Sequence, residues 1–205
     1  MASEFAHPVL ILFAHPAIRK SRVNRRLVEA VRDVEGVTVN DLYEEYPDLS
    51  IDVAREQELF GTHEVVVFQH PFYWYSTPAI LKEWQDLVLE YGWAYGHDGN
   101  ALRGKVLLNA TTTGGGEEAY GSHGSNRFSV RQLLAPIEQT ARLCGMDFLP
   151  PFVVHGTFRL TVPEIEDHAL DYRRLLESLR DGRVRADSVA GLQRINIDLD
   201  RLLEG

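Results

Sequence analysis

Apolar residues along this chain follow two alternating patterns. Short runs in which nearly every residue is apolar occur at residues 9–14, 64–69 and 105–110. Such runs are typical of parallel strands that are buried on both faces of a sheet. Shorter runs at residues 37–39 and 152–155 add two more. The pattern therefore predicts five strands.

Between these runs, apolar residues recur at the three- and four-residue spacing of an amphipathic helix. After the first run, for example, Val23, Leu27, Val28 and Val31 share one helical face. The spacing predicts helices over residues 21–34, 52–60, 78–89, 129–144 (interrupted at Pro136) and 163–180.

Strands that alternate with helices imply a three-layer α/β fold with a parallel sheet and right-handed crossovers. For five strands we expect the doubly wound, flavodoxin-like order 2-1-3-4-5. Residues 1–182 are expected to form this domain, because no linker divides the chain before Gly182. Residues 183–205 are expected to form a C-terminal extension that packs on the body or on a neighbouring subunit.

Charge changes this picture in two places. The 205 residues carry a formal net charge of −9. A negatively charged surface repels polyanions, which argues against general nucleic-acid binding. Residues 41–64 contain eight acidic side chains and one basic one, and residues 14–32 contain six basic and one acidic. The acidic stretch is either a solvated face or a partner surface. The basic stretch follows the first predicted strand, where phosphate groups bind in many α/β proteins.

The cysteine and histidine content narrows the possible chemistry. Cys144 is the single cysteine, so no disulfide can form within one chain and no cysteine-based metal cluster can assemble there. We interpret Cys144 as a core residue and the protein as cytoplasmic. The histidines lack metal-ligand spacing, so we expect no metal site. No signal peptide or transmembrane helix is expected, because the first apolar run is too short.

Three loops carry the candidate chemistry, and each follows a predicted strand. Residues 14–24 bring hydroxyl, amide and guanidinium groups to a strand-to-helix turn, which suits phosphate. Residues 71–76 contain four consecutive aromatic side chains, which need a flat ligand, a second subunit or the core to cover them. Residues 111–117 are rich in glycine, so backbone N–H groups can approach a ligand closely. A plain helix cap and a flexible turn are the structural alternatives.

In a parallel sheet these three loops meet at the edge formed by the carboxyl ends of the strands. A phosphate loop, an aromatic clamp and a glycine-rich edge together favour a mononucleotide with a planar ring, and flavin fits better than adenine. The sequence contains no G-x-x-x-x-G-K-[ST], no G-x-G-x-x-G after the first strand and no G-x-S-x-G. The sequence therefore lacks the motifs that are typical of ATP hydrolysis, Rossmann-type dinucleotide binding and serine hydrolysis.

Five spaced motifs resemble the flavodoxin-like NAD(P)H:quinone oxidoreductases, and above all the small ancillary flavoproteins of glutathione-regulated potassium-efflux systems. The resemblance runs from about Val9 to Arg180 and rests on Ala14-His15-Pro16 with Ser21 and Asn24, on residues 69–76 with Pro78 and Leu81-Lys82, on residues 92–97, on residues 112–117 and on residues 149–152.

The resemblance implies FMN, or alternatively FAD, with NADH or NADPH as co-substrate and a quinone as acceptor. It also implies a homodimer with its active site at the subunit junction. Residues that match the family's flavin contacts are His15, Ser21, Arg22, Val23, Asn24, Phe72, Tyr73, Trp74, Tyr75, Thr112, Thr113, Gly114 and Gly115. Tyr120 and His123 resemble the catalytic pair that polarises the flavin. Tyr95 and His97 resemble residues that line the quinone pocket from the neighbouring subunit.

Two functions follow as hypotheses. The first is a flavin-dependent NAD(P)H:quinone oxidoreductase. Because no dinucleotide-binding motif is present, nicotinamide and quinone are expected to use the same flavin face in turn, which gives ping-pong kinetics. The second is a regulatory subunit of a potassium-efflux antiporter, peripheral on the cytoplasmic side of the inner membrane. The acidic stretch 41–64 is its candidate docking surface.

Overall fold

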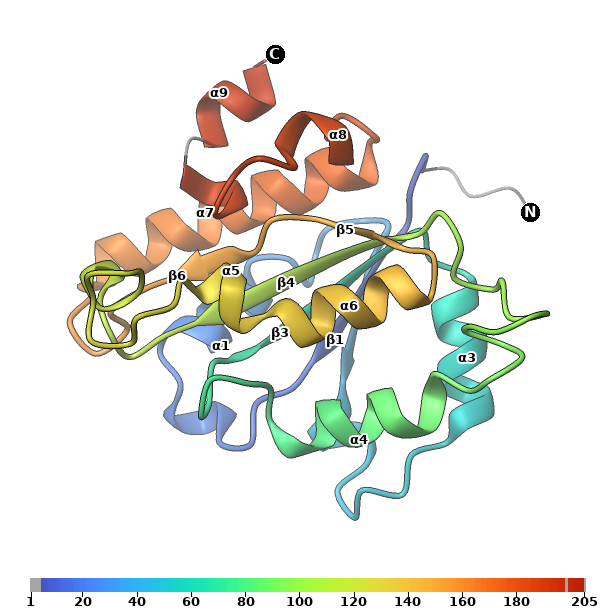
Figure 1. Cartoon of the computed structure of the whole chain (residues 1–205). Coiled ribbons are helices and arrows are strands. Elements are labelled where there is room, and N and C mark those ends of the chain that lie inside the picture. Colours follow the sequence, from blue (N-terminus) through green and yellow to red (C-terminus); the bar gives the residue numbers. More distant parts are fainter. Residues whose placement is uncertain (1–4, 198, 205) are drawn as a thin grey trace.

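The structure is a computed structural model that describes residues 5–197 and 199–204. Its described residues form a parallel sheet of six strands (Figure 1). The strands are β1 (Val9–Phe13), β2 (Val37–Asp41), β3 (Val65–Pro71), β4 (Val106–Thr112), β5 (Asp147–Phe148) and β6 (Phe152–Val154). The order is β2-β1-β3-β4-β5, and β6 also pairs with β4. The predicted strand order is confirmed.

The fifth position in the sheet differs from the prediction of one strand over residues 152–155. Two short strands, β5 and β6, share it, and both run parallel to β4. The N–H of Leu149 still donates to the carbonyl oxygen of Leu107 at 2.9 Å. Pro150 and Pro151 follow, and neither has an N–H to donate to the neighbouring strand. The two prolines therefore divide the strand.

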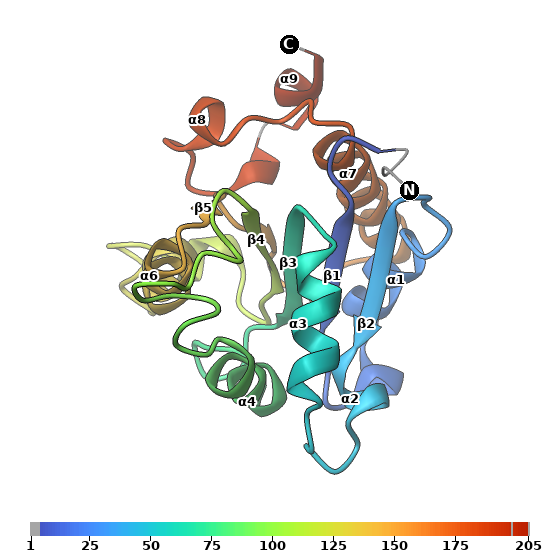
Figure 2. The same ribbon diagram turned by 90° about the vertical axis from the view of Figure 1, so that its right-hand side faces the viewer.

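Helices cover both faces of the sheet (Figures 1 and 2). Helices α1 (Val23–Glu29) and α7 (Val162–Arg180) pack with one set of strand side chains. Helices α3 (Val53–Gly61), α4 (Ala79–Val88) and α6 (Ala135–Leu143) pack with the other set. In Figure 1, α7 lies above the sheet and α4 below it. The predicted three layers are confirmed.

Local side chains set where several helices begin. Asp52 accepts a hydrogen bond from the backbone of Arg55 at the start of α3, and Thr161 forms a capping box with Glu164 at the start of α7. The predicted helix over residues 129–144 is two helices, α5 (Val130–Leu133) and α6. Pro136 lies in the first turn of α6, where its missing N–H costs nothing.

Helix α1 is shorter than the predicted 21–34. It ends at Glu29, and residues 30–34 form turns that still bury Val31 and Val34. The periodic apolar pattern therefore continues past the helix because the turns keep the same buried side.

The acidic stretch 41–64 is mostly a solvated face, but one of its carboxylates is buried. Glu56 on α3 is 0% exposed and accepts hydrogen bonds from Tyr46 Oη at 2.7 Å and Trp84 Nε1 at 2.8 Å. Asn40 Nδ2 donates to it at 2.9 Å, and the guanidinium of Arg55 at 2.5 Å. Glu56 thus joins β2, α3, α4 and the turn that follows α2 (Leu42–Glu45).

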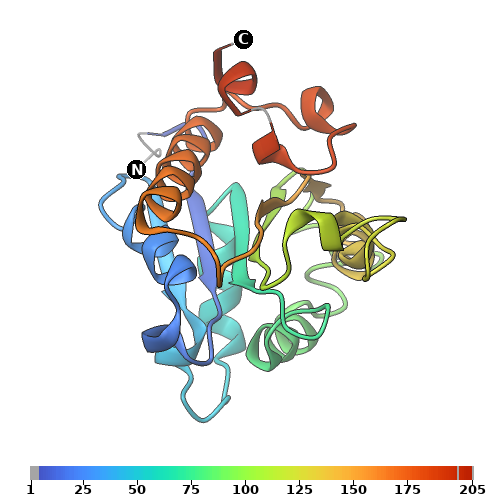
Figure 3. The same ribbon diagram turned by 90° about the vertical axis from the view of Figure 1, so that its left-hand side faces the viewer.

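The C-terminal segment, residues 183–197 and 199–204, lies over α7 and the β6 edge of the sheet (Figures 1 and 3). It contains α8 (Ala186–Val189), the short helix η3 (Ile195–Ile197) and α9 (Leu199–Glu204). Val189 and Ile195 are fully buried in the core. The side chain of Asn196 bonds to both the N–H and the carbonyl oxygen of Val153 at 3.0 Å. The segment therefore packs on the body of its own chain.

Within the described residues, no helix is long and apolar enough to cross a membrane.

Candidate functional site

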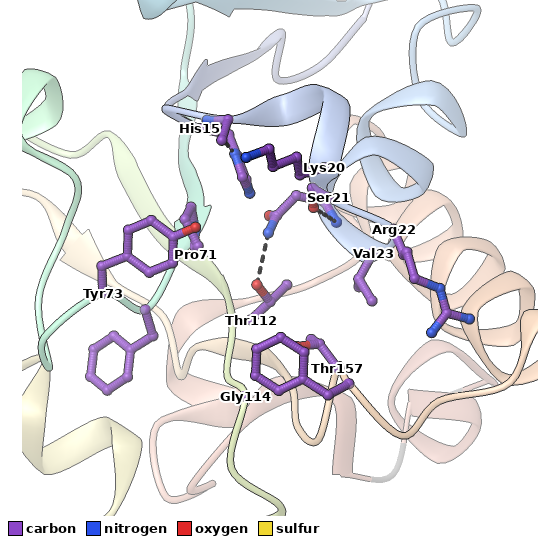
Figure 4. A pocket seen from close by; sticks show the side chains of 14 residues that line it. His15, Lys20, Ser21, Arg22, Val23, Pro71, Tyr73, Thr112, Gly114 and Thr157 are labelled. Carbon is purple, nitrogen blue, oxygen red and sulfur yellow. Dashed lines mark hydrogen bonds between the residues drawn. The ribbon is translucent and has the colours of Figure 1, made fainter.

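A cleft of about 430 Å³ opens at the carboxyl ends of β1, β3, β4 and β6 (Figure 4). It lies where the strand order reverses between β1 and β3, which is where ligands bind in doubly wound sheets. Its lining comes from four loops and consists of His15, Ala17, Lys20, Ser21, Arg22, Val23, Asn24, Pro71, Phe72, Tyr73, Thr112, Gly114, Thr157 and Phe158.

One wall of the cleft is basic. Lys20 and Arg22 both line it, and none of the described acidic side chains does. Arg22 is held by a hydrogen bond from its guanidinium to the carbonyl oxygen of Leu160 at 2.9 Å. Ser21 Oγ accepts the backbone N–H of Asn24 at 3.1 Å, which fixes the turn between them. This wall suits an anionic group such as a phosphate.

Asn24 forms the floor beside that wall and is only 2% exposed. Its Nδ2 donates to Thr112 Oγ1 at 2.7 Å, and its backbone oxygen accepts from Gln69 Nε2 at 3.2 Å. Its Oδ1 is buried and has no hydrogen-bond partner among the described residues. A buried acceptor without a partner is costly, so a donor on a ligand would satisfy it.

His15 closes the cleft between β1 and the aromatic turn. The N–H of Ala17 donates to His15 Nδ1 at 3.1 Å, so the ring proton of the neutral imidazole lies on Nε2. Burial lowers the pKa of His15, which keeps the ring uncharged near neutral pH. The ring meets the edge of Tyr73 with centroids 6.2 Å apart. His15 therefore offers a neutral donor.

The aromatic turn after β3 has a strained backbone. Trp74 and Tyr75 have φ angles of +51° and +64°, in a region that residues other than glycine rarely adopt. The turn is fixed by hydrogen bonds between Phe72 and Thr112 at 2.9 Å and between Tyr75 Oη and Asn126 Oδ1 at 3.1 Å. Trp74 is 93% exposed. Strained backbone of this kind is common at ligand-binding sites. Here it keeps the rings of Trp74 and Tyr75 outside the core.

The glycine-rich loop after β4 is tied to the loop after β6. The N–H of Gly156 donates to the oxygen of Gly115 at 2.9 Å, and Thr113 Oγ1 donates to the same oxygen at 2.7 Å. A Cβ on Gly114 would lie 2.5 Å from the ring of Phe158. Glycine at this position therefore leaves room for the ring of Phe158, which lines the cleft.

A second hollow of about 380 Å³ adjoins the first and is lined by aromatic rings and by Gly115. The Tyr120 ring lies 6.4 Å from Phe72 and 5.4 Å from His155, centroid to centroid. Burial raises the pKa of Tyr120, so its hydroxyl is protonated near neutral pH. Burial is also the main reason why the pKa of His155 falls to about 4. Both groups are therefore uncharged near neutral pH.

The family model described as flavodoxin-like fold matches residues 7–176 of this chain. The chain belongs to the flavodoxin-like fold family.

Three relatives of this flavodoxin-like chain are informative. The glutathione-regulated potassium-efflux system ancillary protein KefF of Enterobacter sp. (strain 638) is 46% identical over 82% of this chain and 94% of its own length. The structure of general stress protein 14 from Treponema denticola, solved in complex with FMN, is 42% identical with a TM-score of 0.80, over 83% of this chain and 98% of that one. An NADPH-quinone reductase structure from P. pentosaceus is 29% identical with a TM-score of 0.75, over 82% and 96%.

The flavodoxin-like fold brings most of the expected site residues together. The three loops predicted to meet at one edge of the sheet do so. The cleft contacts His15, Ser21, Arg22, Val23, Asn24, Phe72, Tyr73, Thr112 and Gly114, and the adjoining hollow contacts Trp74, Tyr75, Gly115 and Tyr120. Thr113 lies beneath, bonded to Gly115 and to His155.

Three expected residues are not brought to this cleft within one chain. His123 is exposed and lines neither hollow. Tyr95 and His97 lie in the loop between α4 and β4, which leads into the amino end of β4, whereas the cleft is at its carboxyl end. Their predicted role was on a neighbouring subunit, and it stays a prediction, as does the role of His123.

The loop after β6 contributes site residues that were not predicted from the sequence. Thr157 and Phe158 line the cleft, and His155 contacts Tyr120. One signal was available, because these residues follow the fifth strand and parallel strands end at the same edge of the sheet.

Proposed function

We propose that this chain is a flavin-dependent NAD(P)H:quinone oxidoreductase that uses FMN. The observation that carries the proposal is a basic wall at Lys20 and Arg22 in the cleft, next to an adjoining hollow whose surface includes the rings of Phe72 and Tyr120. FMN matches this arrangement, because it has a phosphate at one end and a flat aromatic ring at the other. The FMN complex of general stress protein 14 and the named NADPH-quinone reductase support this choice.

The residues of the cleft fit FMN. Lys20, Arg22 and Ser21 would hold the phosphate. The unpartnered Oδ1 of Asn24 would accept a hydrogen bond from a hydroxyl group of the ribityl chain. The bare glycine loop 114–116 leaves backbone groups at the position where the polar edge of the ring would lie. We favour FMN over FAD because the binding of FMN by a relative is direct support.

When bound, FMN supplies hydride transfer from NADH or NADPH to a quinone. The chain's own residues then have three tasks. Trp74 and Tyr75 exclude water from one side of the ring. The protonated hydroxyl of Tyr120 would place a hydrogen-bond donor where charge develops, as an oxyanion hole does, with the neutral ring of His155 packed beside it. His15 provides a neutral donor in the lining of the cleft.

Steady-state kinetics with NADPH and a soluble quinone test this proposal. Because both substrates would use the same open face in turn, plots at several quinone concentrations should give parallel lines. Lines that intersect would argue for a ternary complex and against the shared face. Protein that reduces no quinone and binds no FMN would overturn the function altogether.

We also propose a homodimer in which Tyr95 and His97 complete the quinone pocket of the partner. The chain leaves Tyr91 71% exposed and Leu87 38% exposed on and after α4, which is apolar surface that a second subunit would cover. The same loop carries Tyr95 and His97, so dimerisation would be needed for full activity.

A second candidate function is favoured by the KefF relative. We propose that the exposed acidic face at Glu44, Glu45 and Asp48 docks on a basic surface of a potassium-efflux antiporter on the cytoplasmic side of the membrane. Electrostatic docking of this kind acts mainly on the association rate and weakens with salt.

Replacing those three side chains with Ser should slow association with an antiporter's cytoplasmic domain at low salt. Quinone reductase activity should not change, because the patch lies outside the cleft. A control with the exposed Glu83 and Asp86 changed to Ser removes charge from α4 instead. Equal association of both variants with the partner would rule out the acidic face.

A further inference from the structure

The C-terminal segment places a basic side chain next to the candidate site. Arg194 lies beyond residues 7–176, the part of the chain that the family model matches. It nevertheless lines a cavity of about 280 Å³ together with Tyr120 and His155. The backbone around it is fixed, because the N–H of Ile195 donates to the oxygen of Pro151 at 3.0 Å and Ile195 is fully buried.

Arg194 is joined to the turn that carries Tyr120. Its guanidinium lies 2.9 Å from the carboxylate of Glu117, and the Arg194 side chain is 21% exposed. Glu117 begins the short helix η2 (Glu117–Ala119), and the N–H of Tyr120 donates to the oxygen of Glu117 at 2.9 Å. This ion pair therefore connects the C-terminal segment to the residue that precedes Tyr120 by three positions.

His155, whose ring contacts Tyr120, is held by Thr113. Thr113 Oγ1 uses its one hydrogen to donate to the oxygen of Gly115 at 2.7 Å. In the 3.0 Å hydrogen bond between Thr113 Oγ1 and His155 Nδ1, the imidazole N–H must therefore be the donor. This network assigns the proton of neutral His155 to Nδ1 and leaves Nε2 as an acceptor. A proton gained at Nε2 would turn that acceptor into a donor.

We propose that Arg194 is a positioning residue of the candidate site, which anchors the Glu117–Tyr120 turn and acts as a fixed cation beside His155. The proposal deepens the proposed function and rests on it for the roles of Tyr120 and His155. It also assigns a purpose to the C-terminal segment, which supplies a site residue from outside the matched family region.

The charges around His155 support this role. Burial is the largest cause of its low pKa, of about 4, and Arg194 lowers the pKa further, as does His168 on α7. Glu117 and Glu118 act in the opposite direction and raise it. Arg194 therefore both neutralises Glu117 and keeps a proton off His155, so the acceptor at Nε2 is retained in mildly acidic solution.

NMR titration of the histidine ring signals tests the proposal in the flavin-free protein. In Arg194→Gln, the titration midpoint of His155 should move to higher pH, and in Arg194→Lys it should return toward the wild-type value, because Lys restores the charge. Glu117→Gln should move the midpoint to lower pH. A variant that only loosens the turn would hydrate His155 and raise its midpoint in both Gln variants.

Arg185→Gln is the matched control. Arg185 lies in the same segment, is 78% exposed and pairs with Asp187 at 3.2 Å, away from His155. In Arg185→Gln, the titration midpoint of His155 should equal that in the wild type. The proposal is overturned if Arg194→Gln leaves the midpoint of His155 unchanged, or if Glu117→Gln raises it. Because the measurement needs neither FMN nor quinone, its failure is distinct from a failure of the proposed function.

Discussion

Asn24→Asp should separate the phosphate end of the cleft from the ring end. The change keeps the shape of a side chain that is 2% exposed and places a negative charge beside the basic wall. Thr112 Oγ1 can rotate to donate to the new carboxylate, so the 2.7 Å contact between the two side chains can be kept. For an assumed separation of about 8 Å between this carboxylate and a bound phosphate, the repulsion is ~2 kcal/mol at an effective dielectric constant of about 20. This predicts FMN binding that is ~30-fold weaker, since each 1.4 kcal/mol is a factor of ten.

The assay is quenching of flavin fluorescence, with FMN and riboflavin titrated in parallel. Riboflavin lacks the phosphate, so its affinity should change little. Burial raises the pKa of an aspartate, so the loss of FMN affinity should be larger at higher pH, where the carboxylate is charged. Asn100→Asp, an exposed site outside the cleft, adds the same charge as a control. Equal weakening of FMN and riboflavin would refute the assignment of the phosphate to this end.

Three further predictions concern the rings, the assembly and the core. Trp74→Leu with Tyr75→Leu should change the free energy of unfolding by less than ~1 kcal/mol, because Trp74 is 93% exposed, yet weaken FMN by about 0.5–1.5 kcal/mol per ring; unchanged affinity refutes the clamp. Sedimentation at micromolar concentration should give twice the mass of one chain, and a monomer alone would contradict the shared quinone pocket. Burial lowers the pKa of His70 to about 4, below its unfolded value, so stability that is full above about pH 6.5 should fall by up to ~3 kcal/mol on acidification toward pH 4. Urea melts of His70→Gln should show a flatter pH dependence, and an unchanged slope would exclude His70 as the cause.

The strand order and the place of the cleft were predictable because both depend on local patterns. Continuous apolar runs such as residues 9–14 identify buried parallel strands, and parallel strands end at one edge. The division of the fifth strand was not predicted, since Pro150 and Pro151 look like a simple strand boundary. Only the pairing of residues 147 and 148 with β4 shows that the strand begins before them.

Site residues outside the three expected loops depend on tertiary packing. His155 contacts Tyr120 because β6 ends beside β4, and Arg194 reaches Glu117 because Ile195 and Asn196 bind the C-terminal segment to the sheet edge. No periodic pattern in residues 183–205 indicates these contacts. The exposure of Trp74 likewise follows from a left-handed backbone that its sequence does not reveal.

Titration of the purified chain with FMN tests the central claim most directly. The fluorescence of FMN should be quenched until one FMN is bound per chain, and the complex should keep a flavin absorption spectrum after gel filtration. Reduction of that spectrum by NADPH and its recovery on adding a quinone should follow. Unquenched FMN throughout the titration, from protein that is folded by circular dichroism, would contradict the account.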